Sequence, residues 1–330
     1  MQRAMKVIVF GASGFIGRSL IPRLIQAGHW VRGASRQVRP AHDSVGANEW
    51  VACDVRQPSS LTSALEGVDA AYYLVHSMGA DSGDEYPRIE REGAESFAEA
   101  AKIARLSRIV YLGGVEPKTE PSKHLASRLQ VGRILRESAV PTLELRASMI
   151  IGNGSTSWQI VRDLAMRLPV MVFPAWLESR TSAVAVEDVL VGLVAGLSVH
   201  LDSSTWYDLS GTETLSAREI LIRIAAVRGR RLPGFTVPVL SPRLSARWLK
   251  FVTGADLTVA KELIQGLSHD LIPQREGYWD LIGHHHRMGF DDAVRSALRD
   301  EHLRLKLRPL LGALEEKWVS RFAPKLKRRR

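Results

Sequence analysis

Short apolar segments alternate with segments of helical periodicity through the first 150 residues of this chain. The segments with the length and apolar content of buried strands are 6–10, 29–34, 49–53, 68–75, 108–112 and 141–148. Those with helical character are 18–26, 58–67, 84–104 and 122–138. Because parallel strands need long, usually helical connections, this order predicts a parallel sheet covered by helices on both faces. The expected fold class is therefore α/β, with a doubly wound parallel sheet.

A glycine-rich turn follows the first predicted strand and opens the first predicted helix. Gly11, Gly14 and Gly17 form the pattern G-x-x-G-x-x-G. Glycine allows a tight turn and a close approach of the backbone to a pyrophosphate, and the N-terminus of the helix stabilises the anion. The alternative is a glycine-rich turn that binds no ligand. We expect a dinucleotide to be bound here by Gly11, Ser13, Gly14, Phe15, Ile16 and Gly17.

The segment after the second predicted strand bears on the choice of dinucleotide. Folds of this kind that bind NAD carry an acidic residue there, which accepts hydrogen bonds from the ribose. Here Ser35 and Arg36 occupy the place, with Arg32 nearby. An arginine can bind a 2′-phosphate through paired charge-assisted hydrogen bonds, so NADP(H) is favoured over NAD(H), unless Arg36 is only a solvated surface charge. Asp54 and Val55, after the third strand, are expected by position to meet the adenine amine and ring.

Several of these segments together resemble a known family. GASGFIG, CDV, AYYLVHSMG, RIVYLGG, ELRASMIIGNGS and AVAVEDVL are similar to segments of atypical short-chain dehydrogenases/reductases, in particular the NmrA-like and epimerase-related NAD(P)-binding proteins. The resemblance runs from about Met5 to Ala260 and does not extend to the tail beyond about residue 290. It implies a Rossmann fold of the short-chain dehydrogenase/reductase type and an NAD(P)H-dependent oxidoreductase.

The chain departs from the catalytic pattern of that superfamily. Catalytic members carry Tyr-x-x-x-Lys on the helix after the fifth strand and a Ser or Thr at the end of that strand. Here His124 stands at the tyrosine position, Arg128 at the lysine position, and Gly113 and Gly114 replace the hydroxyl residue. The departure argues against ordinary alcohol dehydrogenation and against sugar epimerisation, since both depend on the tyrosine.

His124 and Arg128 nevertheless lie four residues apart, which places them on one face of a helix. Arg128 could hold the nicotinamide ribose. His124 could act as a general acid because its ordinary pKa is near neutrality, although a cationic neighbour would favour the neutral imidazole. The alternative is that His124 merely begins the helix.

The loop after the fourth predicted strand supplies further candidates, because in this fold it borders the nicotinamide and its ribose. Val75, His76 and Ser77 could contact the cofactor or the substrate, or only cap the next helix. Ser148, at the end of the sixth strand, is a weaker candidate near the same place. The candidate catalytic residues are thus His124, Arg128 and His76.

After residue 150 the alternation weakens, which predicts a smaller mixed region. Its expected strands are 181–185, 205–209 and 235–239, and its expected helices are 157–167, 187–198, 216–227, 241–252 and 259–267. We expect residues 1–150 to form the NAD(P)-binding domain, residues 151–290 a substrate-binding region packed on it, and residues 291–330 a C-terminal helix and basic tail. Aromatic residues in this half could line an apolar substrate pocket or belong to the core: Trp158, Trp176, Trp248 and Trp279.

The net charge of +10 lies largely in that tail. Residues 317–330 hold 7 of the 45 Lys and Arg residues and none of the 35 acids, so the rest of the chain carries 38 basic and 35 acidic residues. This distribution, without a recognisable nucleic-acid-binding motif, argues against a nucleic-acid partner. The tail and the apolar stripe from Leu303 to Trp318 allow weak peripheral membrane contact, although a helix packed on its own domain is favoured.

The remaining features set the expected compartment and exclude a metal. One cysteine, Cys53, excludes an intramolecular disulfide, and no signal peptide or membrane span is apparent, so a cytoplasmic location is expected. Three adjacent histidines in GHHHR (283–287) do not converge on one ion, so no metal site is expected. The predicted function is an NAD(P)H-dependent reductase that acts on a small, fairly apolar substrate without the usual Tyr-Lys pair. The alternative is a non-enzymatic NADP(H)-binding redox sensor or an assembly or regulatory protein.

Overall fold

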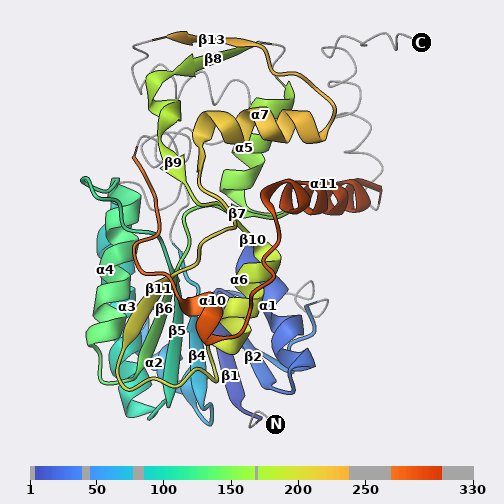
Figure 1. The fold of residues 1–330 in the computed structure, drawn as a ribbon. Helices are drawn as coiled ribbons and strands as arrows, with labels where there is room; N and C mark the ends of the chain where they lie inside the picture. The colour runs from blue at the N-terminus through green and yellow to red at the C-terminus, as the bar shows by residue number, and fades with distance from the viewer. Residues whose placement is uncertain (1–3, 39–44, 77–84, 168–169, 238–268, 307–330) are drawn as a thin grey trace. The chain divides into compact units, whose positions relative to one another are not determined.

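The computed structural model describes residues 4–38, 45–76, 85–167, 170–237 and 269–306, with the side chains of 302–306 left aside. The chain divides into two compact units, each assembled from three segments (Figure 1). The first consists of Met1–Ser148, Val186–Ser210 and Leu271–Arg287, and the second of Met149–Ala185, Gly211–Asp270 and Met288–Arg330. The expected functional division of the chain at residues 150 and 290 stays a prediction.

A seven-stranded parallel sheet forms the centre of the first unit, in the order β11-β6-β5-β4-β1-β2-β3. The strands are β1 (Lys6–Phe10), β2 (Trp30–Ser35), β3 (Glu49–Ala52), β4 (Ala70–Tyr73), β5 (Arg108–Gly113), β6 (Thr142–Arg146) and β11 (Thr205–Asp208). The strand order reverses between β1 and β4, and the crevice beyond their carboxyl ends is where such sheets bind dinucleotides. The predicted doubly wound parallel sheet is confirmed.

The expected position of one strand is wrong. Residues 205–209 were expected in the smaller mixed region, but β11 pairs in parallel with β6, from Thr205 opposite Leu143 to Asp208 opposite Arg146. β11 is an edge strand, and Asp208 is the one buried residue among its four. It therefore lacks the continuous apolar run by which an internal parallel strand is recognised.

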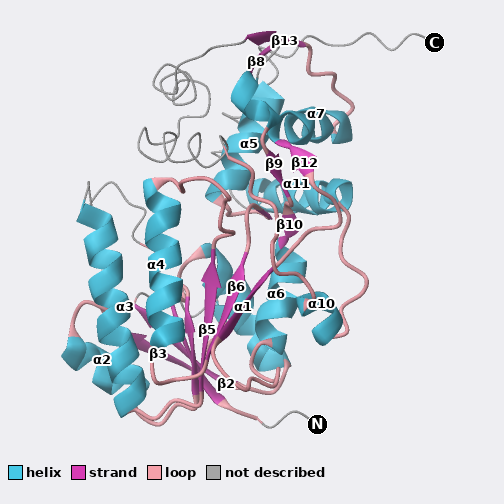
Figure 2. Cartoon of the chain, turned by 60° about the vertical axis from the view of Figure 1, so that its left-hand side comes forward, coloured by secondary structure: helices cyan, strands magenta, loops and turns pink. Residues whose placement is uncertain are grey.

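Helices cover both faces of this sheet, with α2, α3 and α4 on one side and α1 and α6 on the other (Figure 2). Their bounds are α1 (Phe15–Gln26), α2 (Pro58–Leu65), α3 (Tyr86–Ile103), α4 (Lys123–Glu137), α6 (Val186–Ala195) and the short α10 (Tyr278–Leu281). Phe97 of α3 illustrates the packing, because its ring centroid lies 5.0 Å from that of Phe10 and 4.8 Å from that of Tyr73. Burying such a side chain stabilises the fold by about 1.5–3 kcal/mol.

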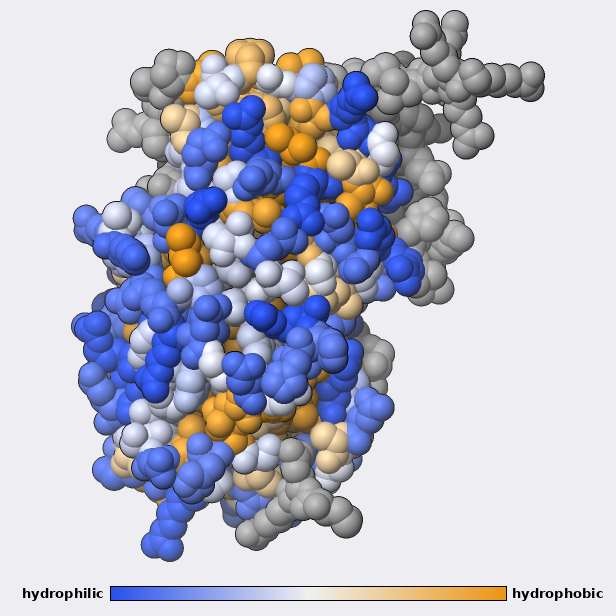
Figure 3. Space-filling model, in the orientation of Figure 1, coloured by the Kyte–Doolittle hydropathy of each residue, from blue (hydrophilic) through white to orange (hydrophobic). Residues whose placement is uncertain are grey.

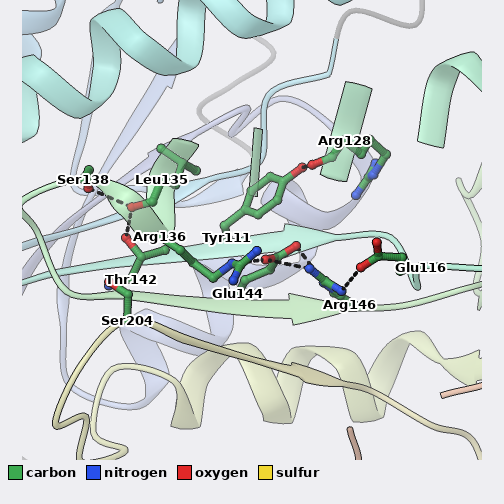
Figure 4. Close-up of polar contacts among 10 residues, drawn as sticks. All are labelled: Tyr111, Glu116, Arg128, Leu135, Arg136, Ser138, Thr142, Glu144, Arg146 and Ser204. Atoms are coloured by element: carbon green, nitrogen blue, oxygen red, sulfur yellow. Dashed lines mark hydrogen bonds and ion pairs between the residues drawn. The ribbon is translucent and has the colours of Figure 1, made fainter. Parts of the chain in front are cut away.

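An ion-pair network is buried beside β6 (Figure 4). The carboxylate of Glu144, whose side chain is 0% exposed, accepts hydrogen bonds from Arg136 Nε at 2.7 Å and from Arg146 Nε at 2.9 Å. Arg146 continues the network to Glu116 at 3.1 Å. A side chain at Gly132 would collide with the Glu144 carboxylate, so glycine makes room for it. The reciprocal pairing offsets the large cost of removing these charges from water.

The second unit has its own core. Its helices are α5 (Thr156–Arg167), α7 (Ala217–Val227), α11 (Phe290–Lys306) and the 3-10 helix η3 (Ala175–Glu178). Its strands form three pairs: β7 (Ile150–Ile151) with β10 (Val184–Ala185), β9 (Arg180–Thr181) with β12 (Leu215–Ser216), and β8 (Met171–Pro174) with β13 (Gly234–Val237). Trp158 is buried in this core and its indole donates to Glu301 at 2.9 Å. Trp279, in the first unit, is also buried, so neither tryptophan lines an open pocket.

Several predicted features lie outside the described residues: the helices at 241–252 and 259–267, Trp248, Ser77, and the basic tail with most of the leucine stripe. Among the helices that the structure describes, none has the length and the apolar content needed to span a bilayer.

Candidate functional site

The glycine turn between β1 and α1 is shaped to receive an anion. Gly11 adopts a left-handed conformation with φ of +79°, and a side chain there would lie 2.5 Å from the carbonyl oxygen of Leu74 at the end of β4. Gly14 is the N-cap residue of α1 and supplies no side-chain cap. The first amide groups of α1 therefore have no side-chain acceptor from the cap residue, and they carry the positive end of the helix dipole. The turn fits the pyrophosphate of a dinucleotide.

The other residues predicted for this loop follow from that arrangement. Ser13 is exposed in the turn, while Phe15 and Ile16 begin α1 and are half-buried. Gly17 is buried, and a side chain on it would collide with the backbone of Gly11 and Ala12. Glycine at this position therefore lets the helix start close against the strand.

The end of β2 presents one free-standing cation. Arg36 is exposed, whereas the Ser35 hydroxyl is buried and donates to the Gln37 carbonyl at 2.7 Å. Arg32 belongs elsewhere, since its guanidinium binds Glu49 at 2.7 Å and the carbonyl that ends α2. Its expected proximity to Arg36 has no functional counterpart.

Asp54, after β3, is held by a neighbour that the sequence did not single out. Arg56 Nη2 lies 2.5 Å from Asp54 Oδ2 and Arg56 Nε 2.9 Å from Oδ1. The hydrogen bond from Arg56 is the main cause that lowers the pKa of Asp54, and the charge of Arg36 contributes. Val55 is half-buried and packs against the core under α3.

The three candidate catalytic residues come together at the ends of β4 and β5 and the start of α4. Arg128 Nη1 lies 2.8 Å from His76 Nε2, and Arg128 Nη2 donates to the Leu112 carbonyl at 2.6 Å. The guanidinium thus joins the loop after β4, which begins at Val75, to the end of β5. Arg128 Nε is buried and has no hydrogen-bond partner within the described part of the chain.

Two further groups fix the start of α4 against the sheet. Tyr111 of β5 donates its hydroxyl to the backbone carbonyl of Arg128 at 3.0 Å (Figure 4). One residue earlier, the Ser127 hydroxyl donates to the buried carboxylate of Glu90 on α3. The sequence could not have indicated these contacts, because each joins residues from separate elements. They hold Arg128 in a defined place.

His124 occupies the first turn of α4, where Ser122 caps the helix by accepting from the Leu125 amide at 3.3 Å. The ring centroid of Tyr86, at the start of α3, lies 6.3 Å from that of His124. Lys123 Nζ lies 5.3 Å from the Tyr86 ring. Tyr86 is therefore the aromatic neighbour of the histidine that replaces the family tyrosine.

The electrostatics of this cluster keep both imidazoles neutral. Burial, and then the charge of Arg128, lower the pKa of His124 to about 3. Desolvation by the surrounding protein, followed by Arg128 and His124, lowers the pKa of His76 well below its ordinary value of 6.5. Part of the His76 side chain reaches solvent, yet the direction follows from the contact itself, since a ring nitrogen that accepts from a guanidinium carries no proton. The predicted effect of the cation on His124 is confirmed.

Other candidates do not join this cluster. Ser148 is half-buried beyond the end of β6. The adjacent histidines of GHHHR have separate partners: His284 Nε2 lies 2.7 Å from Asp188 Oδ1, and His285 Nδ1 lies 3.5 Å from Asp280 Oδ1. No group of His, Cys, Asp and Glu within the described residues has the arrangement of a metal site.

Comparison with known proteins supports this assignment of the cradle. Residues 11–166 match the family model described as NAD(P)H-binding. A ceramide reductase of Caulobacter vibrioides is 26% identical over 66% of this chain and 73% of its own length. A 3 beta-hydroxysteroid dehydrogenase/Delta 5-->4-isomerase of Mycobacterium tuberculosis is 24% identical over 69% of this chain and 70% of its own length. The match to a longer M. tuberculosis protein, 28% identical, covers 77% of this chain but 27% of that protein.

Solved structures share the fold. Triphenylmethane reductase of Citrobacter sp., complexed with NADP(H), superposes with a TM-score of 0.71 at 17% identity, over 88% of this chain and 99% of that one. MoeE5, in complex with UDP-glucose and NAD, gives a TM-score of 0.68 at 17% identity, over 91% of this chain and 99% of that one. The predicted resemblance to atypical short-chain dehydrogenases/reductases and the predicted binding of NAD(P)H are confirmed. Since these neighbours bind different dinucleotides, the preference for NADP(H) stays a prediction.

Proposed function

This chain is an NAD(P)H-binding protein of the atypical short-chain dehydrogenase/reductase type, and on that premise we propose that it is an NADPH-dependent reductase. Its substrate is a small, fairly apolar molecule with a carbonyl, enone or imine group. The observation that carries the proposal is the Arg128 guanidinium between two neutral imidazoles, at the place where the family carries tyrosine and lysine.

The residues divide the work of holding the cofactor. The turn at Gly11, Gly14 and Gly17 receives the pyrophosphate, and Arg36 receives the 2′-phosphate as a charge-assisted partner. Arg128 holds the nicotinamide ribose, for which its buried and unpartnered Nε supplies a donor. When bound, NADPH supplies a hydride from C4 of its nicotinamide ring.

The chain's own groups then stabilise the charge that develops on the substrate. As the acceptor carbon gains the hydride, its oxygen or nitrogen gains negative charge, and the fixed cation of Arg128 stabilises it. With a pKa of about 3, His124 is neutral at pH 7, so it donates an N–H hydrogen bond as an imidazole. The acceptor atom finally takes that proton, and the imidazole regains one from water.

The substrate class rests on the named activities of the relatives. Ceramide and 3 beta-hydroxysteroids are apolar molecules with a hydroxyl or carbonyl at the reacting position, and the two relatives named for them match most of this chain. Their catalysis on large hydrophobic scaffolds favours an apolar carbonyl substrate here over a nucleotide sugar.

Cofactor titration of Arg36→Ala tests the NADPH assignment. Loss of a charged hydrogen-bond donor from a phosphate should weaken NADPH binding roughly 10- to 100-fold and leave NADH binding nearly unchanged. Arg88→Ala is the matched control, because Arg88 is also exposed but pairs with Glu92 and Glu85 on α3. Equal affinities of the wild type for the two cofactors would refute the assignment.

A second pair of variants separates binding from turnover. Arg128→Ala should weaken NADPH binding by about 10-fold or more, since its donor to the ribose is lost. His124→Ala should leave binding nearly intact and slow turnover about 100-fold. The opposite pattern would contradict these roles. Tight NADPH binding with no turnover across a panel of carbonyl, enone and imine compounds would favour a redox sensor instead.

A further inference from the structure

One face of the β8–β13 pair in the second unit is apolar and open. In β8, Met171 and Phe173 are buried in the core, so the alternation of a strand turns Val170 and Val172 to the opposite side. Phe235 lies opposite Val172 in the parallel register and therefore shares that side. The β8–β13 face consists of these outward residues together with the next outward residue of β13: Val170, Val172, Phe235 and Val237.

This face is unusual for the surface of a small sheet. Phe235 is 57% exposed and Val170 48% exposed, and both are among the most exposed large apolar side chains described. A sheet with one side in water normally carries polar residues on that side. Figure 3 shows hydrophobic residues gathered over β8 and β13 at the top of the view. An exposed cluster of this kind marks a surface that contacts another apolar phase.

Cations border the face. Arg228 and Arg231 are exposed in the connection from α7 to β13, and neither forms an ion pair within the described part of the chain. Other arginines of the unit are paired, as Arg218 is with Glu178. The sequence contains no Asp or Glu from residue 220 to residue 255, a stretch with seven Lys and Arg. The positive charge here is therefore not neutralised locally.

The combination selects one occupant. A second copy packed through a two-fold axis would bring the arginines of both copies together, which like charges oppose. An anionic bilayer complements both features, because aromatic and aliphatic side chains enter the headgroup boundary while arginines bind lipid phosphates. We propose that the β8–β13 face, with Arg228 and Arg231, docks this protein on an anionic phospholipid membrane. The surface is separate from the cofactor site, so the inference stands independently of the proposed reductase activity.

Vesicle binding of the full-length chain tests this docking surface. Vesicles of phosphatidylcholine with phosphatidylserine are compared with vesicles of phosphatidylcholine alone, by cosedimentation. The double variant Arg228→Ala/Arg231→Ala should bind the anionic vesicles about 25-fold more weakly, since each cation near such a surface contributes about fivefold. Phe235→Ala should also weaken binding several-fold. Arg295→Ala and Ile103→Ala are matched controls, because they remove an equally exposed cation and apolar side chain from other helices.

The basic tail is present in every variant, so any binding that it contributes is the same throughout the series. Equal binding by wild type, Phe235→Ala and the double arginine variant would overturn the proposal. A fall in melting temperature of several degrees for Phe235→Ala, with vesicle binding unchanged, would mean that the chain covers this face itself. Loss of a concentration-dependent dimer in place of vesicle binding would identify a second copy as the occupant, and would equally overturn it.

Discussion

Replacing His124 by glutamine should flatten the dependence of stability on pH. In the unfolded chain this histidine titrates near 6.5, whereas burial and Arg128 lower its folded pKa to about 3. Between these two values the unfolded state binds more protons, so the free energy of unfolding falls as the pH falls. From the two pKa values, the contribution is complete above pH 6.5 and about 2 kcal/mol smaller at pH 5.

Denaturant unfolding at pH 7 and pH 5, followed by circular dichroism, measures this contribution. The wild type should lose about 2 kcal/mol more free energy of unfolding than His124→Gln between the two pH values. Gln130→Ala, a substitution at an exposed uncharged position on the same helix, should lose as much as the wild type. If His124→Gln and the wild type lose the same amount, the imidazole is not held neutral, and the proposed hydrogen-bond donor would have to act as an imidazolium.

Two other substitutions test the surrounding structure. Glu144→Gln removes the buried negative charge between Arg136 and Arg146 and should lower the free energy of unfolding by about 3–5 kcal/mol, while Glu99→Gln, on the surface of α3, should change it by less than about 0.5 kcal/mol. Similar values for the two, from denaturant unfolding, would mean that the network does not depend on its charge. Gly17→Ala places a methyl group against the backbone of the preceding turn and should reduce NADPH affinity at least tenfold by calorimetry; unchanged affinity would contradict the cradle.

The parallel sheet was predictable because most of its strands are apolar along their whole length. In β1, Val7, Ile8, Val9 and Phe10 are all buried, and such a run has no other stable location. β11 escaped assignment to the sheet for the converse reason. At an edge, Thr205, Trp206 and Tyr207 keep partial contact with solvent, and no periodicity marks the strand.

The same contrast applies to the candidate site. The glycine turn was predictable because its chemistry resides in the backbone, and the required residues are adjacent in sequence. The spacing of His124 and Arg128 placed them on one helix face, and the charge of Arg128 does act on the imidazole. The contact of Arg128 with His76 joins residues that are 52 positions apart, and it depends on the pairing of β4 with β5. Arg32 shows the limit of local reasoning, because its side chain leaves the cofactor side for Glu49.

The central claim is that hydride passes from NADPH to an apolar substrate with Arg128 and His124 in place of tyrosine and lysine. The most direct measurement follows deuterium from NADPH labelled at C4 into the product, by mass spectrometry, with a panel of hydrophobic ketones, enones and imines. We expect one deuterium on the former acceptor carbon, in amounts that fall about 100-fold in His124→Ala at saturating NADPH. Product without deuterium, or full transfer in the absence of both side chains, would contradict the account.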